Sequence, residues 1–341
     1  MKKIKNTGIA NFLTKRFPTE KSAVKFFAEK RWGNETTCPY CKHTIIYKVK
    51  GIQPYKCGGC KRKFTAKTGT IMEGSHVDVR MWLFAMYLMG TARHGISSIE
   101  LAEQIGVQQK TAWFMAHRIR EACTAKGKLK GQIEIDETYI GGKEKNKHSN
   151  KKHHNGRGVA YKIPVVGMKE RDGAVIGKVV ESTSKPAMHA LIEKNVAKKS
   201  AIFTDDHRSY MGLSKKGYQH HIVNHSKGEY VRGIATTNSI ESVWANLKRG
   251  LYATFHHVSK KHLQRYVNEF CFRASNGQVL SFIDAICERS ANAVQYKKLT
   301  RNTYEATSYR AVKSNIRRSS KSGSEIRKEE HIFFRPLVAV A

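Results

Sequence analysis

The chain has 341 residues, with 62 Lys and Arg against 27 Asp and Glu, which gives a formal net charge of +35 at pH 7. Hydrophobic residues make up 40%, enough for buried cores, and 26 Gly with 6 Pro are too few for a fibrous or wholly disordered chain. The length predicts two or three domains. Because so large a charge repels itself unless a polyanion neutralises it, nucleic acid is the expected partner, with a membrane surface as the alternative.

The sequence contains no pattern typical of a membrane-spanning or secreted protein. The longest nearly unbroken apolar run, Met81–Met89, is much shorter than the about 20 residues that cross a bilayer. Residues Met1–Phe17 are basic and lack the apolar stretch of a signal peptide. We therefore expect an intracellular protein. The phosphate-binding motif Gly-x-x-x-x-Gly-Lys is absent from the sequence, so no role for ATP is expected.

Composition and periodicity divide the chain into consecutive parts. An N-terminal segment has helical spacing over 18–32 after a start at Thr19, and a segment with two cysteine pairs follows it. Next come a helical region, an α/β region and a basic C-terminal region, the last being an accessory DNA contact or a disordered end. The expected boundaries are 1–36, 37–70, 76–124, 131–275 and 276–341.

Two cysteine pairs predict a structural zinc site. Cys38-x-x-Cys41 and Cys57-x-x-Cys60 are separated by 15 residues, which lies within the range of zinc ribbons. Each pair offers two sulfurs from one tight turn, and four thiolates bind Zn²⁺ tetrahedrally with no position left for water. A redox dithiol or a chance pairing is the alternative. Three scattered cysteines are expected to be buried thiols: Cys123, Cys271 and Cys287.

Residues Ser97–Ala122 resemble a helix-turn-helix, with Ser97 and Glu100 as a capping box and Gly106 as the turn. Gln and Lys side chains suit base-edge and phosphate contacts in a major groove. The alternative is an ordinary helical hairpin packed between domains. Arg118 and Arg120 are expected near the end of the second helix. The residues expected to contact DNA from that helix are Gln108, Gln109, Lys110 and Thr111.

From residue 131 onward, β-type runs alternate with helical stretches, which predicts a mixed α/β domain. A basic loop, Gly141–Gly158, separates the first two strands. The expected strands are Gln132–Ile140, Tyr161–Met168, Ala174–Glu181, Ala201–Thr204 and His220–Val223. The expected helices are 186–197, 238–249 and 259–274.

Acidic residues are scarce in this basic chain, and three of them occupy informative positions. Ile133 and Ile135 share one face of the first strand, so Glu134 and Asp136 fall on the other. Asp205 ends an apolar strand. Glu241 lies on an amphipathic helix, and Lys248, seven residues later, shares its face.

Three carboxylates that converge in this way can hold two Mg²⁺ ions about 4 Å apart for in-line phosphoryl displacement. Lys248 would bind a substrate phosphate beside them. Each acid also has a structural interpretation: Asp136 as a strand-end hydrogen-bonder, Asp205 as a helix cap, and Glu241 as the capping partner of Asn238. The three together favour the metal site. The histidines are expected to be structural or to contact phosphate, with His225 as the exception that would lie near the metals.

The spacing of Asp136, Asp205 and Glu241, with Lys248 after them, resembles the DDE signature of insertion-sequence transposases and retroviral integrases. The segments Ile135–Gly142, Pro164–Gly167 and Thr237–Glu241, with Leu247–Gly250, are similar to one bacterial family. That family is the zinc-ribbon (ISXO-like) group. Further matching segments are Val223–His225, Gly228–Arg232 and His256–Arg265.

The resemblance implies a ribonuclease H-like fold, a mixed five-stranded sheet flanked by helices, with Mg²⁺ in the site. It implies an enzyme that cuts at the terminal inverted repeats of its element and joins the 3′ ends to target DNA. Asp205 rather than Asp206 matches the catalytic position, and Asn238 is a weaker candidate ligand than Glu241. Lys248 and Arg249 are the expected DNA contacts of the helix.

The implied partner is double-stranded DNA, both the element ends and the target. The resemblance implies that a homodimer or higher oligomer binds this DNA. The expected location is the bacterial cytoplasm, in association with the nucleoid. A membrane is not an expected partner. Two alternatives stay open. One is a structure-selective nuclease of the same fold, which would cut branched DNA without joining. The other is a non-enzymatic DNA-binding regulator, which would need no Mg²⁺.

Overall fold

The computed structural model describes residues 8, 11–142, 162–171, 173–223, 238–289 and 295–300. The chain divides into two compact units, and the first ends at Gln295. Helix α10 (Tyr296–Thr300) is the described part of the second unit. Most of the expected basic loop Gly141–Gly158 lies outside the described residues, as do His225, Gly228–Arg232 and Arg310–Lys328. Among the helices that are described, none has the length and apolar character needed to cross a membrane.

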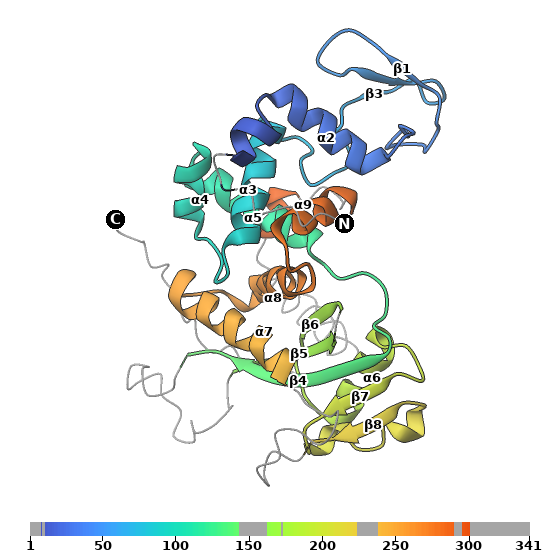
Figure 1. Ribbon diagram of the computed structural model, residues 1–341, viewed down its shortest axis with the longest axis vertical. Helices are drawn as coiled ribbons and strands as arrows, with labels where there is room; N and C mark the ends of the chain where they lie inside the picture. Colours follow the sequence, from blue (N-terminus) through green and yellow to red (C-terminus); the bar gives the residue numbers. More distant parts are fainter. Residues whose placement is uncertain are drawn as a thin grey trace, which may run out of the picture. The chain divides into compact units, whose positions relative to one another are not determined.

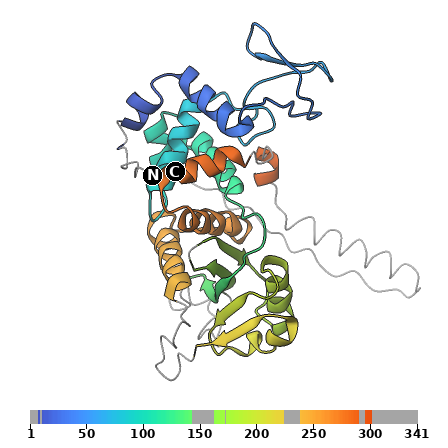
Figure 2. The ribbon, with the colours of Figure 1, turned by 45° about the vertical axis from the view of Figure 1, so that its right-hand side comes forward.

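A bundle of helices forms the core of the N-terminal part (Figures 1 and 2). Its centre is α3, which is the apolar run noted in the sequence, and every residue from Trp82 to Met89 is buried. A helix that is apolar on all sides must be covered on all sides, and neighbouring helices cover α3 here. The elements of this bundle are η1 (Phe12–Arg16), α2 (Glu20–Trp32), α3 (Val79–Thr91), α4 (Ser98–Ile105), α5 (Gln109–Ala122) and α9 (Val279–Glu288).

The helix starts follow the capping residues expected from the sequence. Thr19 and Ser22 form a reciprocal capping box at α2. Ser97 accepts a hydrogen bond from the Glu100 amide at 3.1 Å, which is one half of the box expected at α4. Gly106 ends α4 in the left-handed region (φ 68°), a conformation that glycine adopts without strain. This turn sets α4 and α5 against each other.

Helix α9 lies in this N-terminal bundle although it follows the sheet in sequence (Figures 1 and 2). Its buried residues Val279, Phe282, Ile283 and Ile286 pack in the same core as α2 and α3. Lys30 of α2 forms an ion pair with Asp284 at 2.9 Å. The sequence pattern assigned 276–341 to one basic C-terminal region, whereas residues 279–288 are an apolar helix that completes the helical core.

The cysteine segment forms a three-stranded antiparallel ribbon, β1-β2-β3, beside α2 (Figure 1). Its small core holds Cys38, Cys57 and Phe64, and Trp32 of α2 packs edge-on against the Phe64 ring. A core of this size is too small to stabilise a fold on its own. The strands are β1 (Ile46–Lys48), β2 (Tyr55–Cys57) and β3 (Lys63–Phe64).

The second part of the fold is built on a five-stranded sheet with the strand order β6-β5-β4-β7-β8. Its strands are mixed in direction, which confirms the mixed five-stranded sheet that the resemblance implies. Strands β4, β5 and β6 are antiparallel neighbours, whereas β4, β7 and β8 run parallel. Strands β4 and β7 have the bounds expected from the sequence. The strands are β4 (Gln132–Ile140), β5 (Ile163–Glu170), β6 (Val175–Val179), β7 (Ala201–Thr204) and β8 (Gln219–Ile222).

Helices cover both faces of this sheet (Figure 1). One face packs on α6, with Ile133, Ile135 and Val166 of the sheet in that core. The other face packs on α7 and α8, with Val165 and Val175 of the sheet in the second core. The helices and short turns are α6 (Lys185–Asn195), η4 (Arg208–Tyr210), η5 (Ser214–Lys216), α7 (Asn238–Arg249), η7 (Gly250–Thr254) and α8 (Lys260–Ser275).

Candidate active site and metal centres

Strand β4 carries Asp136 in the middle of the sheet. Because side chains alternate along a strand, Ile133 and Ile135 face α6, while Glu134 and Asp136 face α7, as expected from the sequence. Opposite Asp136 on β5 is Gly167, and a Cβ added there would lie 2.2 Å from Cζ2 of Trp244. Helix α7 therefore lies directly on the sheet beside Asp136.

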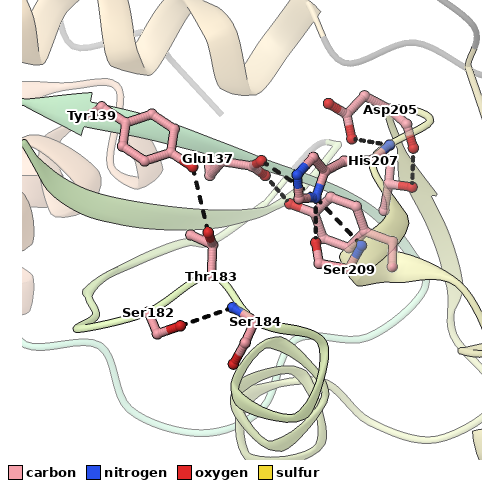
Figure 3. Close-up of polar contacts among 10 residues, drawn as sticks. Glu137, Tyr139, Ser182, Thr183, Ser184, Asp205, His207 and Ser209 are labelled. Atoms are coloured by element: carbon pink, nitrogen blue, oxygen red, sulfur yellow. Dashed lines mark hydrogen bonds and ion pairs between the residues drawn. The ribbon is translucent and has the colours of Figure 1, made fainter. Parts of the chain in front are cut away.

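Asp205 lies at the end of β7, the parallel neighbour of β4 (Figure 3). Its Oδ1 accepts a hydrogen bond from the His207 amide at 3.2 Å, which holds the carboxylate at the strand end. The neighbouring Asp206 is exposed. Parallel adjacent strands end at the same edge of a sheet, so Asp205 and Asp136 are on neighbouring strands at the carboxyl side.

Helix α7 contributes the third acid. Glu241 is exposed in its first turns, and the buried stripe Ile240, Val243, Trp244 and Leu247 fixes the helix on the sheet. Lys248 is half-buried two turns further along the helix. The two side chains share a face because seven residues are close to two full turns.

Asp136 feels the other acids directly. Burial, and after it the nearby charges of Glu137, Asp205 and Glu241, together raise the pKa of Asp136 to about 7. Asp205 and Glu241 thus both lie within electrostatic range of Asp136 in the fold. Within the part of the chain that the structure describes, the oxygens of the three acids do not come as close together as the four cysteine sulfurs, which all lie within 4.8 Å of one another.

The donor set of this cluster is suited to a hard divalent cation. Carboxylate oxygens are the ligands that Mg²⁺ prefers. A cation between them would also offset the repulsion that raises the pKa of Asp136. The residues that could hold it are Asp136, Asp205 and Glu241, with Asn238 at the start of α7.

The four expected cysteines gather at one point of the ribbon. The sulfurs of Cys38 and Cys60 are 3.7 Å apart, and those of Cys41 and Cys57 are 3.5 Å apart. Four sulfurs at 2.3 Å from a tetrahedral zinc lie about 3.8 Å from one another, so the spacing fits the ion. A hydrogen bond to the backbone amide of His43, followed by contacts with the other three thiols, lowers the pKa of Cys41. The same thiol contacts raise the pKa of Cys60, so the four sulfurs titrate as one group.

The two cysteine turns share one backbone geometry. The lysine after each pair, Lys42 and Lys61, has a positive φ of 63° and 60°. Each lysine amide donates to the carbonyl of the first cysteine of its pair, Cys38 at 3.0 Å and Cys57 at 3.1 Å. The turns are therefore two copies of one knuckle, each presenting a pair of sulfurs.

Comparisons with known proteins match both parts of the chain that carry these residues. Residues 128–275 match the ISXO2-like transposase domain, and residues 18–63 match the transposase zinc-ribbon domain. A protein of the transposable element ISH50 of Halobacterium salinarum is 30% identical over 274 residues, which cover 76% of this chain and 92% of that protein. A transposase-like protein of Haemophilus influenzae is 28% identical over 108 residues, covering 32% and 86% of the two chains.

The chain belongs to the IS1595 family of zinc-ribbon DDE transposases. The family and the sulfur geometry together confirm the structural zinc site expected at Cys38, Cys41, Cys57 and Cys60.

Helix α5 of this IS1595-family protein exposes its first residues. Gln108, Gln109 and Lys110 are exposed and Thr111 is half-buried, so the expected DNA contacts are at the surface. The side-chain amide of Gln109 (Nε2) donates a hydrogen bond to the Ser98 hydroxyl at 2.7 Å, which links α5 to the start of α4.

Two arginines that the sequence placed at the end of this helix are buried, so they are not available to DNA in this fold. Arg118 donates to the Glu73 carbonyl and lies over the Trp82 ring. Arg120 forms an ion pair with Glu269 of α8 at 2.6 Å, and both side chains are nearly inaccessible. Both lie near the end of α5, as expected, but they stabilise its packing and do not belong to the surface that its first residues present.

Sequence reasoning assigned no role to two further acids on strand β4 of this IS1595-family protein. Glu137 faces α6 and accepts a hydrogen bond from the Tyr210 hydroxyl, with His207 4.0 Å away (Figure 3). Burial raises the pKa of Glu137. The sequence feature that could have identified Glu137 is its position directly after Asp136, because side chains alternate along a strand and Glu137 must therefore point to the opposite face of the sheet. Glu134 is the second, and its partners on α7 are 105 residues or more away in sequence.

Proposed function

We propose that this chain is the transposase of its element. It binds double-stranded DNA at the terminal inverted repeats, cleaves the 3′ ends by Mg²⁺-dependent hydrolysis and joins them to target DNA by transesterification. The observation that carries the proposal is the carboxylate cluster: Asp136, Asp205 and Glu241 come from two adjacent strands and one helix, and the pKa of Asp136 is raised to about 7 by burial and then by its acidic neighbours.

We assign the sheet to the ribonuclease H-like fold. In support, three antiparallel strands are followed by two parallel ones, and Asp136 lies on the central strand. Helices pack on both faces of the sheet. Asp136 lies on β4, Asp205 directly follows β7 and Glu241 lies on α7.

In the proposed reaction Asp136, Asp205 and Glu241 would hold two Mg²⁺ through carboxylate oxygens, with Asn238 as a weaker candidate. Mg²⁺ held there would supply activation of the attacking water or 3′-hydroxyl and charge stabilisation of the leaving oxygen in an in-line displacement. Asp136 must lose its proton before it binds. Lys248 holds a phosphate of the DNA near the acids, and Arg249 adds a second phosphate contact from the end of α7.

The DNA ends are bound by the basic surface and by helix α5. Gln108, Gln109, Lys110 and Thr111 enter the major groove in a helix-turn-helix with α4. Phosphate contacts supply most of the affinity, so binding weakens as salt rises. Two ends must be paired for joining, and we propose a homodimer or higher oligomer for that step.

The test is a cleavage and joining assay on the DNA that flanks the gene, with Mg²⁺ or EDTA. Wild type is compared with Asp136→Asn, and Asp205→Asn with its matched neighbour Asp206→Asn. Mg²⁺-dependent cutting and joining that Asp136→Asn and Asp205→Asn abolish, but Asp206→Asn retains, is the expected result. Cutting of branched DNA without joining would instead indicate a structure-selective nuclease. Tight binding with no cutting by wild type would indicate a DNA-binding regulator.

A further inference from the structure

Glu134 is a carboxylate buried between the sheet and helix α7. Its side chain is 1% exposed. Its Oε2 accepts hydrogen bonds from the backbone amides of Ser239 and Ile240, both at 3.1 Å. These amides belong to the first turn of α7, whose N–H groups have no partner within the helix. A buried carboxylate is costly unless it is hydrogen-bonded, and the positive end of a helix dipole favours it.

Cationic side chains complete the surroundings of Glu134. Arg171 Nε lies 3.5 Å from its Oε1 and the Arg171 guanidinium lies over the Phe203 ring. Lys169 Nζ donates to the Ser239 carbonyl at 3.4 Å. The start of α7 is therefore held by polar contacts from both β4 and β5.

The other contacts of α7 do not define its position along the sheet as sharply. Trp244 lies against Gly167, and the rest of the stripe is aliphatic. Hydrophobic contact is non-directional, whereas two hydrogen bonds to one oxygen fix the first turn of the helix. Glu241 follows Ile240 directly, and Asp136 follows Glu134 by two residues on the same strand face.

We propose that Glu134 is a positioning residue for the metal site, which rests on the function proposed above. It caps α7 from β4 and thereby sets the position of Glu241 relative to Asp136. Glu134 itself uses both oxygens on protein groups and touches neither DNA nor metal. One carboxylate thus couples the strand and the helix that supply two of the three acids.

The test compares Glu134→Leu, which fills the space without an acceptor, with Glu134→Gln, which keeps one acceptor oxygen of similar reach. Glu170→Gln is the control, because Glu170 also accepts two backbone amides, Lys130 at 2.8 Å and Ala174 at 3.2 Å, away from α7. Three quantities are measured: hydrogen exchange of the Ser239 and Ile240 amides, Mn²⁺ affinity by calorimetry, and cleavage rate against Mg²⁺ concentration.

In Glu134→Leu we expect faster exchange of those two amides and a metal affinity lower by about 10–100-fold, the usual effect of losing a group that orients metal ligands. Cleavage should then need correspondingly more Mg²⁺, while binding of DNA ends in EDTA stays unchanged. Glu134→Gln should fall between wild type and Glu134→Leu. Glu170→Gln should match wild type in all three measurements.

Wild-type exchange and metal affinity in Glu134→Leu, or an equal loss in Glu170→Gln, would overturn the proposal. If Glu134→Leu does not fold, unchanged exchange and affinity in Glu134→Gln relative to the control overturn it in the same way. Failure of the proposed function is a separate result: wild type then neither binds Mn²⁺ nor cuts DNA, whatever the exchange rates at α7.

Discussion

Asp136 makes the stability of the metal-free protein depend on pH. Its pKa in the fold is about 7, against an ordinary value of 3.8, because it is buried and faces other carboxylates. The folded state binds this proton more tightly than the unfolded chain. The stabilisation of the folded state by protonated Asp136 is therefore complete below pH 3.8 and is lost as pH rises to about 7.

An ionised Asp136 destabilises the metal-free fold, because it is a buried charge beside other carboxylates. Asp136→Asn removes this charge, so in EDTA the variant should be more stable than wild type above pH 7. The difference is a few kcal/mol at most, since each pKa unit is worth about 1.4 kcal/mol. The measurement is the thermal midpoint of both proteins at pH 4 and pH 8. Equal midpoint differences at the two pH values would contradict the prediction. Added Mg²⁺ should stabilise wild type and leave Asp136→Asn nearly unaffected.

The zinc ribbon depends on its ion at the level of a whole element. Only Cys38, Cys57 and Phe64 are fully buried in it, so the ordered state of β1, β2 and β3 rests on the metal. Cys41→Ser should release zinc and make residues 38–64 susceptible to proteolysis, while the mixed sheet stays protected. Cys287→Ser, a buried cysteine outside the ribbon, should keep one zinc per chain by metal analysis. Protection of the ribbon after zinc loss would refute this dependence.

Helix α7 rests on a sheet surface that only glycine allows. A Cβ at Gly167 would lie 2.2 Å from Trp244, and backbone on one side and an indole on the other leave no room to yield. Gly167→Ala should lower the free energy of unfolding by about 1–3 kcal/mol, the usual cost of overpacking. At Gly142 a Cβ meets nothing within 4 Å, so Gly142→Ala should be neutral. Urea denaturation of the two variants checks this, and equal stabilities would show that α7 can shift without cost.

Elements with strong periodicity were predictable, and contacts between distant residues were not. Strand β4 and helix α7 were predicted with the bounds that the structure has, because alternation and a four-residue apolar stripe define them locally. Helix α9 carries a similar stripe, but a basic C-terminal composition obscured it. The burial of Arg120 depends on Glu269, 149 residues away, and no local pattern encodes such a pairing. Spacing and resemblance single out the three acids as a prediction, whereas the contacts of Glu134 become visible only in the packing of α7.

Across the whole molecule, a buried ion cluster joins the helical bundle to the sheet. Glu269 of α8 is inaccessible to solvent and binds Arg120 of α5 at 2.6 Å and Arg273 of α8. The Arg120 guanidinium also lies over the Tyr266 ring at 4.0 Å. Helix α5, which exposes the proposed DNA contacts, is thereby attached to α8, which packs on the sheet.

Glu269→Gln should lower the free energy of unfolding by about 3–5 kcal/mol, because it leaves buried arginine charge uncompensated. Glu193 is the matched surface case, since it also bridges two cations, Lys198 at 3.4 Å and Lys216 at 3.1 Å. Glu193→Gln should lower the free energy of unfolding much less than Glu269→Gln, because solvent screens exposed ion pairs. Urea denaturation of both variants gives the comparison, and similar losses would mean that burial does not strengthen the Glu269 cluster.

The return of α9 to the N-terminal bundle has a consequence for synthesis of the chain. About 190 residues, including the whole mixed sheet, are translated between the end of α3 and the start of α9. At about 5–20 residues per second this takes roughly 10–40 s, during which the bundle lacks its last helix. A polypeptide released before residue 279 has all four zinc ligands and the three acids, yet its helical core is open on the side that α9 covers. Completion of the N-terminal fold therefore waits on a helix that is synthesised only after the whole mixed sheet.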